Sequence, residues 1–185
     1  GLQDAIKVSQ KASGTFDAPN WDAASQKKVR DALLALGSTI PDFKKAFGTR
    51  SDVDPIRHLI GSAAAWGGNP DKDAIYLNVT PSQNDGKTAY KLTVKEVPVD
   101  AFWSVTVYDP VTGSGLDNGQ AFPSINTMDK PATNPDGSTD IYFGPSSPGE
   151  GRNWLKTLPD KGFFVILRLY GPTKAFFDQS WKPSD

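Results

Sequence analysis

Apolar residues near the start of the chain recur with a helical period. Trp21, Val29 and Leu33 fall near one face of a helix that repeats every 3.6 residues. Asn20 is placed to cap the first turn, and Gly37 is placed to end the last one. The pattern therefore predicts a helix between these two residues.

Two further helices are predicted before the pattern changes. The first covers residues 41–47, with a proline near its start and a glycine after its end. The second begins at the cap Asp54 and ends at Gly67-Gly68. Its apolar stripe follows the spacing i, i+3, i+4, i+7 and consists of Ile56, Leu59, Ile60 and Ala63. Residues 1–66 are thus expected to form a helical arm packed on the rest of the domain.

After Gly68 the period becomes alternating, which predicts strands. Residues 75–79 and 90–94 are separated by a turn-forming segment and are predicted to pair as a hairpin. Further strands are predicted at 102–108, 122–125, 140–143 and 163–170, of which the last is the most apolar and suits the middle of a sheet. Strands separated by turns, after helices gathered at one end, predict a mainly β chain. Its β-sandwich domain covers residues 67–185 and forms a single compact unit with the arm.

Composition and charge exclude several kinds of partner. Twenty basic and twenty-one acidic residues give a net charge of −1, so nucleic acid is not an expected partner. No apolar run approaches the ~18 to 20 residues of a membrane-spanning helix. With no cysteine, one histidine and no glycine-rich loop leading into a helix, the sequence indicates no metal and no cofactor.

Two predicted strands carry polar residues that suit a binding site. Arg168 and Tyr170 share one face of strand 163–170, and Ser104, Thr106 and Tyr108 share one face of strand 102–108. If these strands are neighbours, the five side chains converge. A guanidinium beside two phenols and two hydroxyls suits a ligand with a carboxylate or phosphate group.

Each of these candidates also has a structural alternative. A buried Arg168 must be paired, and Asp109, Asp136 or loop carbonyls could pair with it. Trp154 lies in a predicted loop, where it could stack on a ligand that Asn153 orients, or could simply pack in the core. His58 is the only histidine, so a Ser-His-Asp triad would have to use it, but it lies off the apolar stripe and fits a solvent-facing or capping role.

Ordered sequence phrases between residues 67 and 183 carry a family resemblance. They are GGNPDKDAIY (67–76), VDAFWSVTVYD (99–109), NPDGSTDIYFG (134–144), NWL (153–155), FFVILRLYGP (163–172) and SWKP (180–183). From about residue 55 onward the chain resembles DUF1214, a largely bacterial domain of unknown function that usually follows a companion domain, DUF1254. The resemblance implies a jelly-roll-like antiparallel β-sandwich and an exported, extracytoplasmic protein, but no established activity or catalytic residues. The first fifty residues leave no room for the companion domain.

Three functions stay open. A small-molecule or carbohydrate-binding module is favoured because aromatic, Asn and Arg side chains are plentiful while strong nucleophile–base pairs are missing. A metal-independent hydrolase or lyase would use Tyr108 or Tyr170 as acid or base and Arg168 as stabiliser, and would need a shifted tyrosine pKa. A structural or interaction protein would dock on a partner, or form a homo-oligomer, through residues 15–66. An exposed apolar patch there would favour it.

Overall fold

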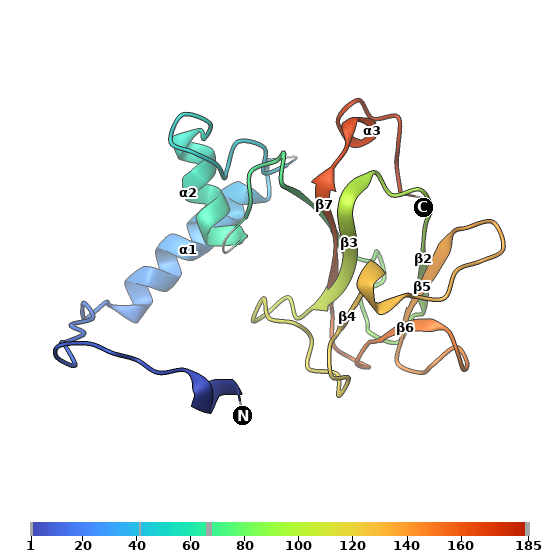
Figure 1. Cartoon of the computed structure of the whole chain (residues 1–185), viewed down its shortest axis with the longest axis horizontal. Coiled ribbons are helices and arrows are strands. Elements are labelled where there is room, and N and C mark those ends of the chain that lie inside the picture. The colour runs from blue at the N-terminus through green and yellow to red at the C-terminus, as the bar shows by residue number, and fades with distance from the viewer. Residues whose placement is uncertain (1, 41, 66–67, 184–185) are drawn as a thin grey trace.

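In the computed structural model, which describes residues 2–40, 42–65 and 68–183, seven strands form two sheets (Figure 1). The first sheet has the order β1-β7-β3-β4 and the second the order β2-β5-β6. The strands are β1 (Ala74–Val79), β2 (Tyr90–Val94), β3 (Val99–Tyr108), β4 (Ser124–Asn126), β5 (Thr139–Gly144), β6 (Asn153–Lys156) and β7 (Phe164–Pro172). The chain is therefore mainly β. Its first sheet is antiparallel throughout, but β5 and β6 run parallel, so the prediction of a purely antiparallel fold is wrong there.

The predicted hairpin of the first two strands is also wrong. β1 pairs with β7 and β2 pairs with β5, so the two strands belong to different sheets. The connection between them is held by the segment that leads into β7. The Asn84 side chain accepts a hydrogen bond from the Phe163 backbone at 2.8 Å, and the Thr157 hydroxyl donates to the Gly86 carbonyl at 2.7 Å. These long-range hydrogen bonds fix the path of the chain from the first sheet to the second.

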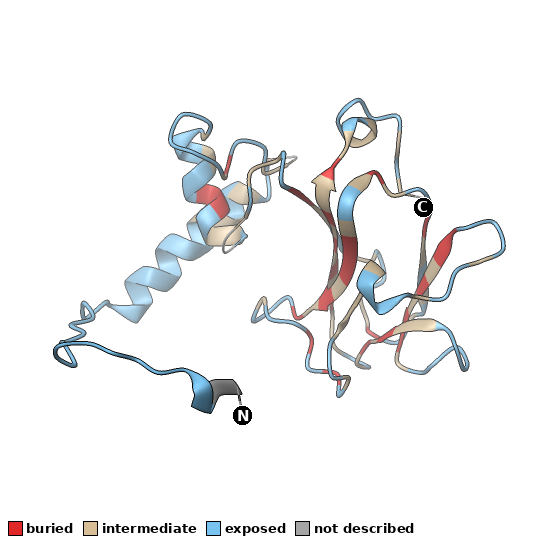
Figure 2. Cartoon of the chain, viewed as in Figure 1, coloured by how far each residue is buried: buried red, intermediate tan, exposed pale blue. Residues whose placement is uncertain are grey.

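The core lies between the two sheets, because buried residues of both form one cluster. The cluster consists of Ile75, Val94, Trp103, Val105, Val107, Leu116, Ile141, Phe143, Leu155, Phe163, Val165, Leu167 and Leu169. Figure 2 shows buried residues along the strands of both sheets and few in the helical part. The alternation predicted for residues 102–108 and 163–170 is confirmed, since every second residue from Trp103 to Val107 and from Phe163 to Leu169 enters the core. The residues between them occupy the outer face of the four-stranded sheet.

Two of the three helices predicted near the start of the chain are present. α1 (Ala23–Gly37) is capped by Asp22 rather than Asn20, since the Asp22 side chain accepts a bond from the Ser25 backbone. α2 (Pro55–Ala64) is capped by Asp54, as predicted. The remaining helical elements are η1 (Leu2–Ala5), η2 (Thr127–Asp129) and α3 (Lys174–Phe177). The described helices are all too short or too polar to span a bilayer.

The helix predicted over residues 41–47 does not form in residues 42–47. Lys45 has a left-handed backbone, with φ 59°, which interrupts a right-handed helix. The segment bends around α2 instead, and its Ala46 carbonyl contacts the His58 ring nitrogen at 2.7 Å, which gives this histidine a structural role. Pro41 and Gly67, the predicted start of this helix and end of the next, lie outside the described residues.

α1 and α2 contact chiefly each other. Figure 1 shows the pair on the side of the four-stranded sheet that faces away from β2-β5-β6. α2 buries Ile60 and Gly61, whereas α1 buries none of its residues. The helical part therefore has little core of its own.

Candidate binding face around Arg168

Arg168 lies at the centre of the outer face of the four-stranded sheet. It is opposite Ser104 on β3 and opposite Tyr76 on β1. The condition on which the site hypothesis depends, that β3 and β7 are neighbours, is thus met. The sheet brings Arg168 onto one face with the other residues that the sequence suggested, Ser104, Thr106, Tyr108 and Tyr170.

The guanidinium of Arg168 lies between two tyrosine rings. Its carbon is 5.2 Å from the ring centroid of Tyr108 and 5.8 Å from that of Tyr76. Its Nη2 donates a hydrogen bond to the Tyr108 hydroxyl at 2.5 Å. The Tyr76 hydroxyl in turn accepts a bond from the Asn69 side chain at 2.7 Å. Cation–π contacts of this kind contribute about 0.5 to 2 kcal/mol each, depending on how far the cation is desolvated.

No carboxylate forms an ion pair with Arg168 within the described residues. The two aspartates proposed as structural partners are engaged elsewhere. Asp109 pairs with Lys161 at 2.8 Å, a bond that lowers the pKa of this aspartate, and Asp136 lies 3.7 Å from Lys95. A guanidinium has five N–H donors, and Arg168 uses one of them in a side-chain hydrogen bond to a neutral hydroxyl. The face therefore keeps a positive charge that an anion could pair with.

Two stacked aromatic pairs flank the cation. Tyr170 stacks on Phe102 with ring centroids 4.2 Å apart, and Tyr108 stacks on Phe164 at 5.2 Å, each with an interplanar angle of 19°. Stacking fixes the orientation of both phenols, so their hydroxyls are held in place before any ligand arrives. Five aromatic rings, counting Tyr76, thus share one sheet face with the cation, and two of them, Tyr76 and Tyr108, contact it.

The hydroxyl groups of this face differ in their partners. The Thr106 hydroxyl lies 2.9 Å from that of Ser124, across the pairing of β3 with β4. Burial raises the pKa of the Tyr170 phenol, while the positive charge of Arg168 acts in the opposite direction. The phenol therefore stays protonated at neutral pH, so it can donate a hydrogen bond but does not act as a base.

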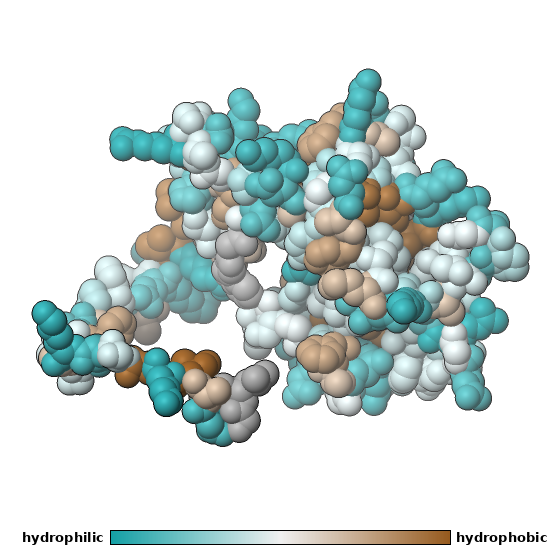
Figure 3. All heavy atoms as spheres, viewed as in Figure 1, coloured by the Kyte–Doolittle hydropathy of each residue, from teal (hydrophilic) through white to brown (hydrophobic). Residues whose placement is uncertain are grey.

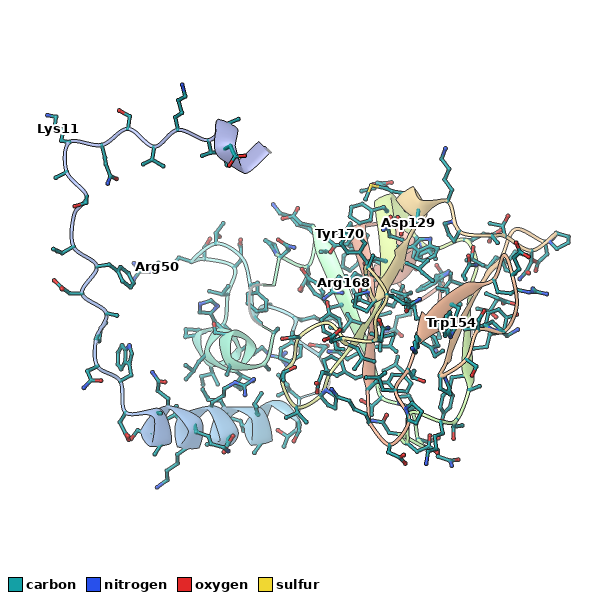
Figure 4. All side chains as sticks on the ribbon, turned by 90° about the horizontal axis from the view of Figure 1, so that it is seen from below. Lys11, Arg50, Asp129, Trp154, Arg168 and Tyr170 are labelled. Atoms are coloured by element: carbon teal, nitrogen blue, oxygen red, sulfur yellow. The ribbon has the colours of Figure 1, made fainter. Side chains whose placement is uncertain are left out.

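Trp154 and Asn153 do not join the Arg168 face. They lie on β6, in the other sheet, and Figure 4 shows Trp154 away from Arg168 and Tyr170. The segment predicted as a loop is an edge strand paired with β5, which fixes both side chains. The Asn153 amide donates to the Ala132 and Asp140 carbonyls and accepts from the Ala132 backbone, all at 2.8 Å. Asn153 therefore holds a loop in place.

Trp154 has a structural bond and also lines a hollow. Its indole nitrogen donates to the Gly144 carbonyl at 2.9 Å. The hollow has a volume of about 560 Å³, and Phe122, Lys130 and Arg152 are among its other lining residues. It lies where the edge strands β4 and β6 approach each other. Trp154 is therefore part of a second surface, separate from the Arg168 face.

Three aromatic residues of the Arg168 face were missed by sequence reasoning. Phe102 and Phe164 have the same strand parity as Tyr108 and Tyr170, so alternation alone could have placed them there. Tyr76 could not be found in this way, because its position depends on the pairing of β1 with β7.

The two sheets and the Arg168 face define a mainly β domain whose most distinctive feature is a cation between two tyrosine rings. The chain belongs to the family described as protein of unknown function (DUF1214), whose model matches residues 74–174. The family resemblance noted in the sequence is thereby confirmed. No protein with a curated description matches the chain.

Two solved structures are similar to the chain. The VPA0106 protein from Vibrio parahaemolyticus has 23% identity and a TM-score of 0.61, over 93% of this chain and 46% of its own. An uncharacterised protein from Burkholderia cenocepacia has 25% identity and a TM-score of 0.48, over 58% of this chain and 28% of its own. The chain therefore spans less than half the length of either protein. The first likeness shows a shared fold and no activity.

Proposed function

We propose that the chain is a small-molecule-binding module that holds a carboxylate or phosphate group at Arg168. The observation that carries this proposal is the enclosed guanidinium, which has one neutral hydrogen-bond acceptor and no carboxylate partner within the described residues. Partial removal of a charge from water is unfavourable unless a partner compensates it. A ligand anion would supply that partner through the bidentate geometry that arginine offers.

The side chains around Arg168 indicate which chemical groups the ligand carries besides its anion. The stacked rings of Tyr170 and Tyr108 offer flat apolar surface, and their hydroxyls offer hydrogen bonds at fixed positions. Ser104 and Thr106 add small polar groups on the same face. An acidic sugar or a small ring-bearing acid satisfies this combination of charge, flat surface and hydroxyls. Neutral sugars satisfy only part of it.

Calorimetric titration with benzoate, glucuronate and inorganic phosphate, with glucose as the neutral control, tests this proposal. We expect Arg168→Met to weaken binding of the acids by at least about 30-fold, because truncating one partner of a desolvated charge pair costs about 2 kcal/mol or more. Arg152→Met, in the Trp154 hollow, is the matched control and should bind as the wild type does.

Thermal unfolding of each variant separates binding from folding. If Arg168→Met does not fold, Tyr108→Phe keeps the ring and removes only the hydroxyl that accepts the arginine bond. That variant should still weaken acid binding. Equal binding of the acids to wild type, Arg168→Met and Tyr108→Phe would show that Arg168 does not hold them. Loss of binding in Arg152→Met alone would move the site to the Trp154 hollow.

The hydrolase or lyase alternative receives less support. A tyrosine that acts as a base must lose its proton near neutral pH, and burial raises the pKa of Tyr170 instead. Tyr170 could still act as an acid. Turnover of an acidic substrate that is lost in Tyr170→Phe, with binding retained, would favour this alternative over simple binding.

The resemblance supports two further proposals, namely that the two sheets form a jelly-roll-like sandwich and that the protein is exported. The helical pattern of the sequence supports a third, that residues 1–66 form an arm packed on the sandwich. A second candidate function, interaction through the helices, is favoured by the exposed apolar residues of α1 and α2.

A further inference from the structure

The α1/α2 pair leaves much of its apolar surface uncovered. The exposed fractions of Trp21, Val29, Ile56 and Leu59 are 67%, 61%, 67% and 57%. An apolar stripe on a helix normally faces a core, yet on α2 only Ile60 of the large stripe residues is buried. Figure 3 shows hydrophobic side chains gathered on the surface of this part of the molecule. The apolar stripe that was predicted to face the core thus lies largely at the surface.

The exposed residues adjoin a groove between the two helices. The groove has a volume of about 600 Å³, and its apolar lining is Trp21, Val29, Leu33 and Ala63. Ala63 lies one turn beyond Leu59, so the apolar stripe of α2 continues into the groove. No acidic residue lines it. Groove and stripe form one continuous surface, which we call the α1/α2 groove.

The stability of α1 requires that this apolar surface is covered. The helix has 15 residues, and none of them is buried. Isolated helices shorter than ~12 to 15 residues are marginal in water, because most helical stability in proteins comes from packing of the apolar face. A single partner helix covers only part of that face. The stable arrangement for paired amphipathic helices is a bundle in which further helices enclose the apolar surface.

We infer that the α1/α2 groove is a dimer interface, in which two copies of the chain pack groove against groove as a four-helix arrangement. Besides its apolar side chains, the groove is lined by one charged residue, Arg30. A twofold interface uses the same patch on both chains, so the apolar side chains of one groove can pack against those of the other. The exposed side chains Trp21, Val29, Leu36, Ile56 and Leu59 offer roughly 100 Å² of apolar surface each. The total, roughly 500 Å², supplies more than half of the ~800 Å² per partner of a stable interface.

Sedimentation velocity of the whole chain over a wide concentration range tests this inference. We expect a dimer that Val29→Asp dissociates, with the dissociation constant raised by about 100-fold or more, because the lost burial counts once on each chain. Val111→Asp is the matched control, since Val111 is 85% exposed and lies in the loop after β3. It should dimerise like the wild type.

A second variant and a second readout guard against local unfolding. Leu59→Gln alters α2 instead of α1 and should also dissociate the dimer if Val29→Asp unravels α1. Because the chain has no cysteine, Ser25→Cys in the groove should form an intermolecular disulfide on oxidation, and Ser146→Cys, in the loop after β5, should not.

Two outcomes would overturn the inference. One is a wild-type chain that stays monomeric at every concentration, including a monomer that binds a different protein through the groove. The other is a dimer that both Val29→Asp and Leu59→Gln leave unchanged, since its interface would then lie elsewhere. Neither outcome bears on acid binding at Arg168, which is measured separately.

Discussion

Replacing Gly86 with alanine should destabilise the fold far more than the same change at Gly137. Both glycines have left-handed backbones, with φ of 67° and 81°. A Cβ at Gly86 would lie 1.9 Å from the Leu158 carbonyl oxygen and 2.5 Å from that of Lys161, whereas at Gly137 no atom lies within 4 Å. The Gly86 carbonyl also accepts the buried hydrogen bond from Thr157. The pair of variants therefore separates backbone strain from a steric clash.

The expected magnitudes follow from these contacts. A left-handed alanine costs about 1 to 2 kcal/mol, of which about 0.4 to 1 is offset by the stiffer unfolded chain. Gly137→Ala should thus lower the free energy of unfolding by about 1 kcal/mol. Gly86→Ala adds about 1 to 3 kcal/mol of overpacking and about 1 kcal/mol for the weakened hydrogen bond, so we expect a loss of about 3 to 5 kcal/mol.

Urea unfolding followed by tryptophan fluorescence measures both variants against the wild type. The reasoning requires that Gly86→Ala loses at least about 2 kcal/mol more than Gly137→Ala. Equal losses would refute it, because they would mean that the segment 157–161 moves away from Gly86 at no cost. That movement would also break hydrogen bonds that direct the chain from β1 to the second sheet.

Two further predictions concern polar groups. Backbone bonds from Thr88 and Lys87 lower the pKa of Asp85 to about 2, so its stabilising effect should be complete above about pH 4 and lost as the pH falls towards 2. Asp85→Asn should flatten the pH dependence of urea unfolding in that window, and an unchanged slope would contradict the assignment. Asn153→Ala, which removes three bonds to backbone groups, should cost about 2 to 3 kcal/mol of unfolding free energy and leave acid binding unchanged. Full stability with weakened binding would instead make Asn153 a ligand-binding residue.

Local patterns in the sequence were enough to predict which side chains of β3 and β7 share the face of Arg168, but not that the two strands are neighbours. Alternation on β3 and β7 separates Val105 and Leu167, which enter the core, from Ser104 and Arg168, which do not. The apolar character of β7 also indicated its central position between two neighbours. These features depend only on which residues lie two positions apart.

Features that depend on long-range contacts could not be predicted in this way. The turn-forming residues between β1 and β2 suggested a hairpin, but hydrogen bonds donated to this segment by the Thr157 hydroxyl and the Phe163 backbone direct it elsewhere. β6 is short and follows a glycine-rich stretch, so nothing local distinguishes it from a loop, and its parallel pairing with β5 defines it. The same pairing explains why Trp154 and Asn153 lie apart from Arg168.

The position of β7 in the sheet has a consequence for how the protein acquires its structure. β7 is the last of the seven strands in sequence, yet it lies between β1 and β3 and hydrogen-bonds to both. During synthesis, the edges of β1 and β3 that pair with β7 stay unpaired until β7 leaves the ribosome. Contacts so distant in sequence slow folding and prolong the exposure of aggregation-prone edges. The strand that carries Arg168 is therefore also the one whose arrival completes the sheet.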